Sequence, residues 1–232
     1  MEIKLSSLLA CLQSGVMFLG NTLKVSVISI MLGSLLALII ALVRFYKIPV
    51  LSKLSAVFVT IYRGIPFMVI LLITHLLYVL YFNPIAKALH LGVTINDVDI
   101  IILGYITITI GIIPSASETF RGALQSIDRT QIEASHSIGM TTFQSLYRVI
   151  LPQMFPVAFP TYINNILGVV KGVPLLASLG IQEIMQGSLL PCSISYSYIE
   201  GYTATAIIYF VLIMLILTAA KFVERRITRF RY

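Results

Sequence analysis

Charged residues are scarce in this sequence of 232 residues. Asp, Glu, Lys and Arg together make up 11% of it, whereas soluble domains carry about 25%. Hydrophobic residues make up 58%, and tryptophan is absent. This composition excludes an ordinary soluble domain and predicts an all-α polytopic membrane protein.

Cysteine is also rare. The two cysteines, Cys11 and Cys192, lie far apart in different segments and show neither metal-ligand spacing nor a redox motif. We therefore expect two small buried or interfacial thiols, no metal site and no catalytic centre. The phosphate-binding pattern G-x-x-x-x-G-K-[ST] is missing as well, so we expect no cofactor in this chain. Any energy from ATP would have to come from a separate polypeptide.

The formal net charge of +7 raises the prospect of a nucleic-acid partner. However, the basic residues gather at the ends of apolar segments, and the aromatic residues lie within those segments. Membrane topology explains this distribution better than a nucleic-acid surface does, so we expect a lipid bilayer as partner and no nucleic acid.

Five apolar segments are long enough to cross a bilayer. They predict five transmembrane helices in a single domain spanning 1–232, at roughly 23–43, 54–82, 100–116, 154–173 and 204–222. The second is interrupted by Tyr62-Arg63-Gly64-Ile65-Pro66, because Pro66 removes a backbone donor. Residues 3–14 form an amphipathic stretch that is too short to span and is expected at the interface.

The basic residues orient these segments. With the N-terminus outside, eleven of the 16 fall on the inner side: Arg44, Lys47, Lys53, Arg121, Arg129, Arg148, Lys221, Arg225, Arg226, Arg229 and Arg231. Only Lys4 and Lys87 fall outside, and Lys24, Arg63 and Lys171 lie within spans. The positive-inside rule therefore predicts an outer N-terminus and a cytosolic C-terminus.

A polar, helix-prone stretch over 121–152 follows the third span on the predicted cytosolic side. Small residues around Glu133 would let another surface approach the backbone, and Gly139 offers a turn. Phe143, Tyr147 and Ile150 then recur at helical spacing. The pattern predicts two short helices that dock a cytosolic partner and are expected to stop at Pro152.

This stretch resembles the membrane subunits of ABC importers, which carry E-A-A, three residues, Gly, nine residues and I-x-L-P. Here the pattern reads Glu133-Ala134-Ser135, then Gly139, then Val149-Ile150-Leu151-Pro152, with Ser135 and Val149 as departures. The resemblance implies a type I importer permease fold and a cytosolic coupling loop over 119–152. The residues it assigns to ATPase coupling are Glu133, Ala134, Ser135, Gly139, Leu151 and Pro152.

Further runs resemble the polar amino-acid branch of these permeases: Tyr62–Pro66, Glu118–Ser126, Ile150–Gln153 and Lys171–Leu175. The last run departs most, because Val173-Pro174 replaces a Thr-Ser pair of the family. Gly172 is closer to cystine-type relatives than to arginine- or glutamine-type ones. The resemblance implies import of a polar amino acid, with cystine among the candidates.

Several polar or backbone-breaking residues within the spans or just beyond their ends are candidates for the substrate path: Arg63, Gly64, Pro66, Glu118, Asn164 and Lys171. Arginine binds carboxylates bidentately, and Glu118 could pair with an ammonium group. The alternatives are that Arg63 and Lys171 snorkel, that Glu118 caps the third span, and that Asn164 hydrogen-bonds between helices.

The resemblance also implies partners. These are two ABC ATPase subunits that bind ATP and Mg, a second permease (the same chain or a homologue) and an extracytoplasmic solute-binding protein. The location would be a bacterial cell membrane. Two alternatives stay open: an importer permease for another small solute, and a transporter or channel that needs no ATPase.

Overall fold

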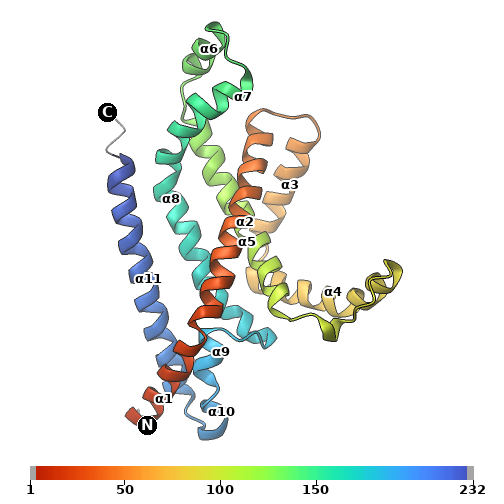
Figure 1. The fold of residues 1–232 in the computed structure, drawn as a ribbon, viewed down its shortest axis with the longest axis vertical. Helices are drawn as coiled ribbons and strands as arrows, with labels where there is room; N and C mark the ends of the chain where they lie inside the picture. The colour runs from red at the N-terminus through yellow and green to blue at the C-terminus, as the bar shows by residue number, and fades with distance from the viewer. Residues whose placement is uncertain (1–3, 229–232) are drawn as a thin grey trace.

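The computed structural model describes residues 4–228, and this part of the chain is built from helices and their connections (Figure 1). Five helical stretches are long and apolar enough to cross a membrane: Leu19–Phe45, Phe67–Ala88, Ile101–Gln125, Thr142–Leu179 and Tyr198–Ile227. The all-α, five-span prediction is therefore confirmed. Arg229 and Arg231, which we counted on the inner side, lie outside the described residues.

The α-helices follow one another along the chain as α1 Leu5–Met17, α2 Leu19–Phe45, α3 Leu51–Gly64, α4 Phe67–Ala88, α5 Ile101–Gln125, α6 Arg129–Ser137, α7 Thr142–Ser145, α8 Leu151–Gly172, α9 Ile184–Leu189, α10 Cys192–Ser195 and α11 Tyr198–Thr228. A 3-10 turn, Ile95–Asp97, precedes α5, a π-helical turn, Leu146–Ile150, joins α7 to α8, and a 3-10 segment, Val173–Leu179, follows α8.

The core lies where α2, α5 and α8 pack together. Buried residues from all three helices meet there, among them Ala37, Ile112 and Met154. Gly33 allows the closest approach, because a Cβ at this position would collide with Cγ2 of Ile112. Small residues at such crossings are typical of membrane helices, which associate through close packing.

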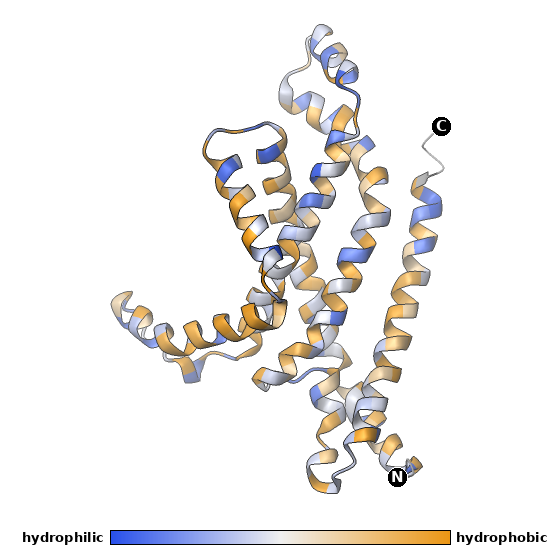
Figure 2. Cartoon of the chain, turned by 180° about the vertical axis from the view of Figure 1, so that it is seen from behind, coloured by the Kyte–Doolittle hydropathy of each residue, from blue (hydrophilic) through white to orange (hydrophobic). Residues whose placement is uncertain are grey.

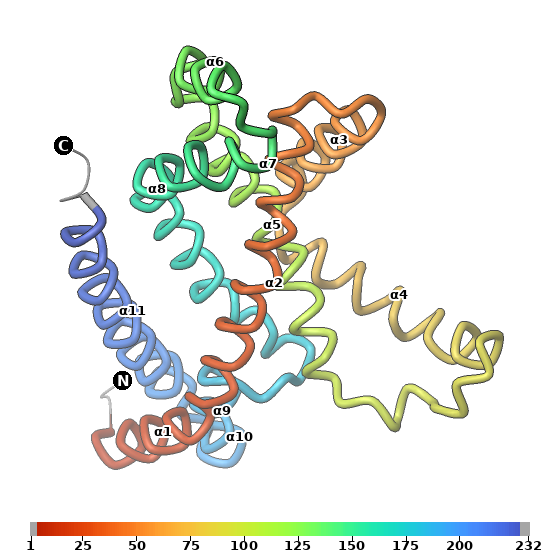
Figure 3. Tube along the Cα trace, turned by 45° about the horizontal axis from the view of Figure 1, so that its top comes forward, coloured from red at the N-terminus to blue at the C-terminus, as the bar shows by residue number. Residues whose placement is uncertain are grey.

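The second predicted span is two helices rather than one. α3 ends at Gly64, Ile65 is extended, and Pro66 precedes the first residue of α4. The predicted interruption at Tyr62–Pro66 is confirmed, whereas the helix long enough to cross a membrane is Phe67–Ala88 rather than the predicted 54–82. Figures 1 and 3 show the consequence: α4 leaves the bundle and projects sideways. Only 6% of the residues in the most apolar 18-residue stretch of α4 are buried.

The connection between the third and fourth spans is shorter than the 119–152 predicted for it. Residues 119–125 are the last turns of α5, and Leu151 and Pro152 begin α8, so the connection between these two helices covers 126–150 and includes α6, α7 and the π-helical turn. The expected stop at Pro152 is wrong. The π-helical turn before it ends with the amide of Leu151 donating to the carbonyl of Leu146. Proline is tolerated at the start of a helix because no amide donor is needed there.

The two ends of the molecule differ in composition. Polar residues gather on α6, on α7 and at the end of α11, while the shafts between the ends are apolar (Figure 2). At the opposite end, α1 packs against α9 and α11. The N-terminus lies at this end and the C-terminus at the other (Figures 1 and 3).

Candidate functional site

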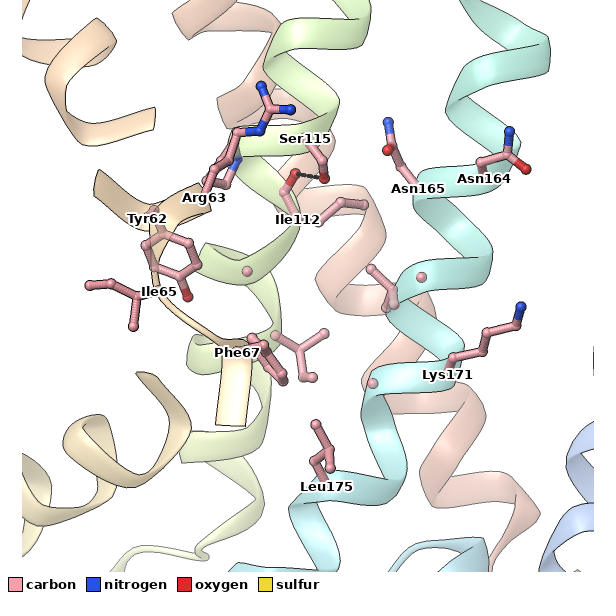
Figure 4. Close-up of a pocket in the computed structure, with 16 residues that line it drawn as sticks. Tyr62, Arg63, Ile65, Phe67, Ile112, Ser115, Asn164, Asn165, Lys171 and Leu175 are labelled. Atoms are coloured by element: carbon pink, nitrogen blue, oxygen red, sulfur yellow. Dashed lines mark hydrogen bonds between the residues drawn. The ribbon is translucent and has the colours of Figure 1, made fainter. Parts of the chain in front are cut away.

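A pocket of about 520 Å³ lies between the end of α3, the middle of α5 and the second half of α8. Three residues predicted for the substrate path, Arg63, Asn164 and Lys171, line it together (Figure 4). They come from segments about 100 residues apart in the sequence. Gly64 and Pro66, also predicted, form the backbone break at its edge without lining it.

The break after α3 shapes one side of this pocket. The last turn of α3, just before the break, carries Tyr62 and Arg63. After the break the chain turns so that Phe67 forms part of the pocket wall (Figure 4). Phe67 is accommodated by Gly111 of α5, where a Cβ would lie 2.9 Å from Cε2 of the ring. The hydroxyl of Tyr62 is buried without a hydrogen-bond partner in the described structure. A buried hydroxyl normally has one, so Tyr62 is a hydrogen-bonding group available to a ligand or a water.

The other side of the pocket is one face of α8. Asn164, Gly168 and Lys171 of α8 recur there at helical spacing, Leu175 of the following 3-10 segment continues the row, and all four are exposed. Asn165, the next residue, also lines the pocket, and its side-chain amide donates to the hydroxyl of Thr119 of α5 at 2.8 Å. Asn165 therefore joins α8 to α5, whereas Asn164 is exposed.

The pocket is basic and amide-rich. None of the sixteen described residues lining it is acidic, whereas two are cations and two are asparagines. Glu118 does not line it, although we predicted it for the substrate path. Its carboxylate is paired with Arg44 of α2 and with Arg121, whose Nη2 lies 2.6 Å from Oε2. Glu118 therefore joins the end of α2 to the end of α5, a role close to the helix-end alternative.

The predicted coupling residues form a second site at the polar end. Asp128 caps α6 by accepting from the amide of Thr130 at 2.9 Å, and this hydrogen bond lowers the pKa of the Asp128 carboxyl. After α6, Gly139 adopts φ +82°, and the amide of Met140 donates to the carbonyl of Ser135. This is the glycine-dependent helix end that the sequence predicted. Thr141 then caps α7 through a reciprocal pair of hydrogen bonds with Gln144.

Serine hydroxyls fasten the two short helices together. The Ser135 hydroxyl donates to the carbonyl of Ile132 at 2.6 Å. The hydroxyl oxygen of Ser145 lies 2.7 Å from the hydroxyl oxygen of Ser135. Both side chains are buried. Ser135 therefore faces the interior between α6 and α7, while Glu133 and Ala134 are exposed. Leu151 is half-buried and Pro152 exposed at the start of α8.

Large apolar side chains also point outward at this end. Ile138, Phe143 and Tyr147 are each about two-thirds or more exposed, at 75%, 74% and 68%. An apolar surface on a polar, solvent-side element is typical of a protein interface. The helical spacing already indicated Phe143 and Tyr147, but Ile138 was missed because it stands alone before Gly139. Tyr62 and Arg44 were also missed as contributors to these sites. Among residues 4–228, no group of three His, Cys, Asp or Glu side chains could hold a metal ion.

Comparisons with known proteins identify the family of this chain. Residues 29–229 match the family model of the binding-protein-dependent transport system inner membrane component. The chain is 31% identical over 212 residues to the probable amino-acid ABC transporter permease protein PatM of Vibrio harveyi, covering 91% of each chain. It is also 31% identical to the L-cystine transport system permease protein TcyL of Bacillus subtilis, covering 91% of this chain and 86% of that protein.

Solved structures share the fold. A chain from the crystal structure of an amino acid ABC transporter with histidines superposes with a TM-score of 0.79 at 25% identity, covering 97% of this chain and 100% of that one. A chain of the inward-facing MetNI methionine ABC transporter superposes with a TM-score of 0.73 at 20% identity, covering 93% and 96%. The fold is therefore that of type I ABC importer permeases. This multi-pass membrane chain belongs to the family of binding-protein-dependent transport system inner membrane components.

Proposed function

We propose that this chain is the permease subunit of an ATP-driven importer of amino acids, and that the pocket at Arg63, Asn164 and Lys171 lies on its substrate path. The observation that carries the proposal is this pocket, which gathers polar residues from two spans within an apolar protein. Intramembrane polar residues are costly and usually mark a transport path. The names of its relatives PatM and TcyL support an amino-acid substrate, cystine included.

The chemistry of the pocket favours recognition of carboxylate groups. Arg63 and Lys171 offer cationic donors, and Asn164 and Tyr62 offer neutral hydrogen-bonding groups. No described lining residue offers a carboxylate to a cationic side chain. The substrate we propose is therefore a neutral or acidic amino acid, or cystine with its two carboxylates, rather than a cationic amino acid.

The polar end, comprising α6, α7 and the outward-pointing Ile138, Phe143 and Tyr147, would dock into a groove of an ATPase subunit. ATP and Mg would be bound by that partner, and this chain would perform no covalent chemistry. A second permease would complete the path, and a binding protein would deliver the amino acid at the end formed by α1, α9 and α10. The distribution of basic residues supports a cytosolic position for α6 and α7 and an outer N-terminus.

The test is ATPase activity of the complex in nanodiscs with its binding protein and a panel of amino acids. The panel includes cystine, glutamate, glutamine and arginine. We expect stimulation by a neutral or acidic amino acid or by cystine, and none by arginine. A copurifying ATPase that no amino acid stimulates would move the substrate to another solute class. Uptake by this chain without any ATPase would support an ATPase-independent transporter instead.

A further inference from the structure

Cys11 and Cys192 are in contact in the folded chain. Their sulfur atoms lie 3.6 Å apart, although the residues are separated by 181 positions. Both side chains are completely buried, one in α1 and the other at the start of α10. The expectation of two small buried thiols is correct, but their spacing along the chain held no sign that they form a pair.

The surroundings hold the two sulfur atoms in place. The backbone of α11 presses on Cys192 from one side, because a Cβ at Gly201 would lie 2.5 Å from its Sγ. The carbonyl of Ser197 lies 3.1 Å from the same sulfur. Cys11 approaches from α1, and Ala204 of α11 completes the cluster. Neither thiol has room to turn toward solvent, so each has the other as its nearest reactive neighbour.

The pair lies at the end of the molecule formed by α1, α9 and α10, far from α6 and α7 (Figure 1). In the orientation proposed above, this is the extracytoplasmic end, and the inference rests on that orientation. Structural disulfides form and persist in such compartments, whereas cytosolic thiols are kept reduced. From contact distance, the sulfur atoms need to approach by only about 1.6 Å to reach bonding distance.

We propose that Cys11 and Cys192 form a disulfide bond that fastens α1 to α10. α1 leads directly into the first span through Phe18, and α10 leads into the last span. The bond would therefore join the outer ends of the first and last spans covalently. The pocket and the polar end both lie between the two cysteines in the sequence. The bond would keep α1 packed on α9 and α11 while the spans move during transport.

The bond would form by thiol–disulfide exchange with the disulfide of an extracytoplasmic thiol oxidant. One cysteine thiolate attacks the oxidant to give a mixed disulfide, and the second thiolate displaces the oxidant's sulfur. Two protons and two electrons leave the cysteine pair, and the oxidant departs as a dithiol. In the folded chain, burial and the hydrogen bond with Cys192 raise the pKa of Cys11 to about 11. The exchange must therefore take place before α1 closes over Cys192.

The test uses the full-length protein from membranes that are quenched with acid and then denatured in N-ethylmaleimide. Intact mass spectrometry then counts adducts before and after reduction. We expect no adduct on the wild-type chain without reductant, a mass lower by two hydrogen atoms than that of the dithiol form, and two adducts after reduction. The variants Cys11→Ser and Cys192→Ser should each take one adduct without reductant, which verifies complete labelling.

One or two adducts on the unreduced wild-type chain would overturn the proposal. A reporter fused to the N-terminus separates the causes. Free thiols with an outer N-terminus overturn the disulfide alone, and free thiols with a cytosolic N-terminus overturn the proposed orientation together with it. As a second readout, reductant should lower the Tm of the purified wild-type chain and leave that of the Cys11→Ala, Cys192→Ala double variant unchanged. An equal effect of reductant on both chains would contradict a fastening role.

Discussion

The hydroxyl oxygen of Ser135 lies 2.7 Å from that of Ser145 in the buried seam between α6 and α7. The importer pattern has alanine where this chain has Ser135, and alanine has no hydroxyl, so a chain with that alanine cannot form this hydrogen bond. Because the Ser135 hydroxyl also bonds the carbonyl of Ile132, the two serines are not equivalent.

Ser135→Ala should loosen the α6–α7 pair more than Ser145→Ala does. The first change leaves the Ser145 hydroxyl buried without a partner, at a cost of about 1–2 kcal/mol, whereas Ser135 keeps its bond to Ile132 after the second. Hydrogen exchange of the α6 and α7 amides should therefore speed up by roughly 5–30-fold in Ser135→Ala. The double variant, which removes both hydroxyls, should recover part of the loss. Equal effects of the two single variants would contradict this asymmetry.

Gly139→Val should uncouple the ATPase from transport. The φ of +82° at Gly139 is costly for a β-branched residue, so the turn that positions α7 behind α6 would be lost. We expect binding-protein-stimulated ATPase activity to fall about tenfold, corresponding to about 1.4 kcal/mol, while the permease still inserts in the membrane. Gly139→Asn should retain more activity because asparagine tolerates this conformation.

Gly122 offers the matched control for that experiment. It is also exposed, and an added Cβ would meet open space there as it would at Gly139, but Gly122 lies within α5 at an ordinary helical φ. Gly122→Ala should therefore couple normally. Normal coupling in Gly139→Val, or a loss of equal size in Gly122→Ala, would refute the proposed role of the turn.

Arg63→Leu should impair amino-acid uptake without preventing assembly. A charge-assisted hydrogen bond to a carboxylate contributes about 1.5–3 kcal/mol, so uptake should fall roughly tenfold or more. Arg63→Lys keeps the charge but loses the bidentate geometry, so its uptake should lie between that of the wild type and that of Arg63→Leu. Lys53→Met, on the exposed surface of the same helix α3, is the control and should transport normally. Wild-type uptake by Arg63→Leu would remove this residue from the substrate path.

Glu183→Gln should change how stability depends on pH. Burial raises the pKa of the Glu183 carboxyl above its ordinary value of 4.5, against the opposing hydrogen bonds from Tyr209 and from the amides of Met185 and Gln186. The folded state therefore holds this proton more tightly than the unfolded state does. The resulting stabilisation is complete below the unfolded pKa and is lost as pH rises through the folded pKa.

The Tm of the wild-type chain should accordingly fall relative to that of Glu183→Gln as pH rises above the ordinary value of 4.5, as followed by circular dichroism in detergent. Glutamine can still accept from the Gln186 amide, which the Glu183 carboxylate caps at 2.8 Å. A difference in Tm that stays constant across this range would show that Glu183 does not titrate differently on folding.

Local signals predicted much of this molecule. The apolar segments indicated the number of spans, Gly139 indicated the helix end, and three residues proposed for the substrate path, Arg63, Asn164 and Lys171, line one pocket. Local signals could not show which direction the chain takes after a break. Pro66 indicates an interruption, but only packing determines that α4 projects away from the bundle.

Pairing between distant segments was equally hidden. Glu118 was a candidate for pairing with the ammonium group of the ligand, but its partner in the fold is Arg44, which lies 74 positions away. The contact between Cys11 and Cys192 was invisible for the same reason. A sequence pattern identifies a group that needs a partner, and tertiary structure decides which group supplies it.

The helical run from Thr142 to Leu179 connects the proposed coupling end to the pocket face without an intervening loop. It changes direction between α7 and α8, where the π-helical turn Leu146–Ile150 joins the two helices (Figure 1). In the proposed importer, a movement of α7 against the ATPase would reach Asn164 and Lys171 through this turn, so the geometry of the turn would set how much of that movement arrives at the pocket.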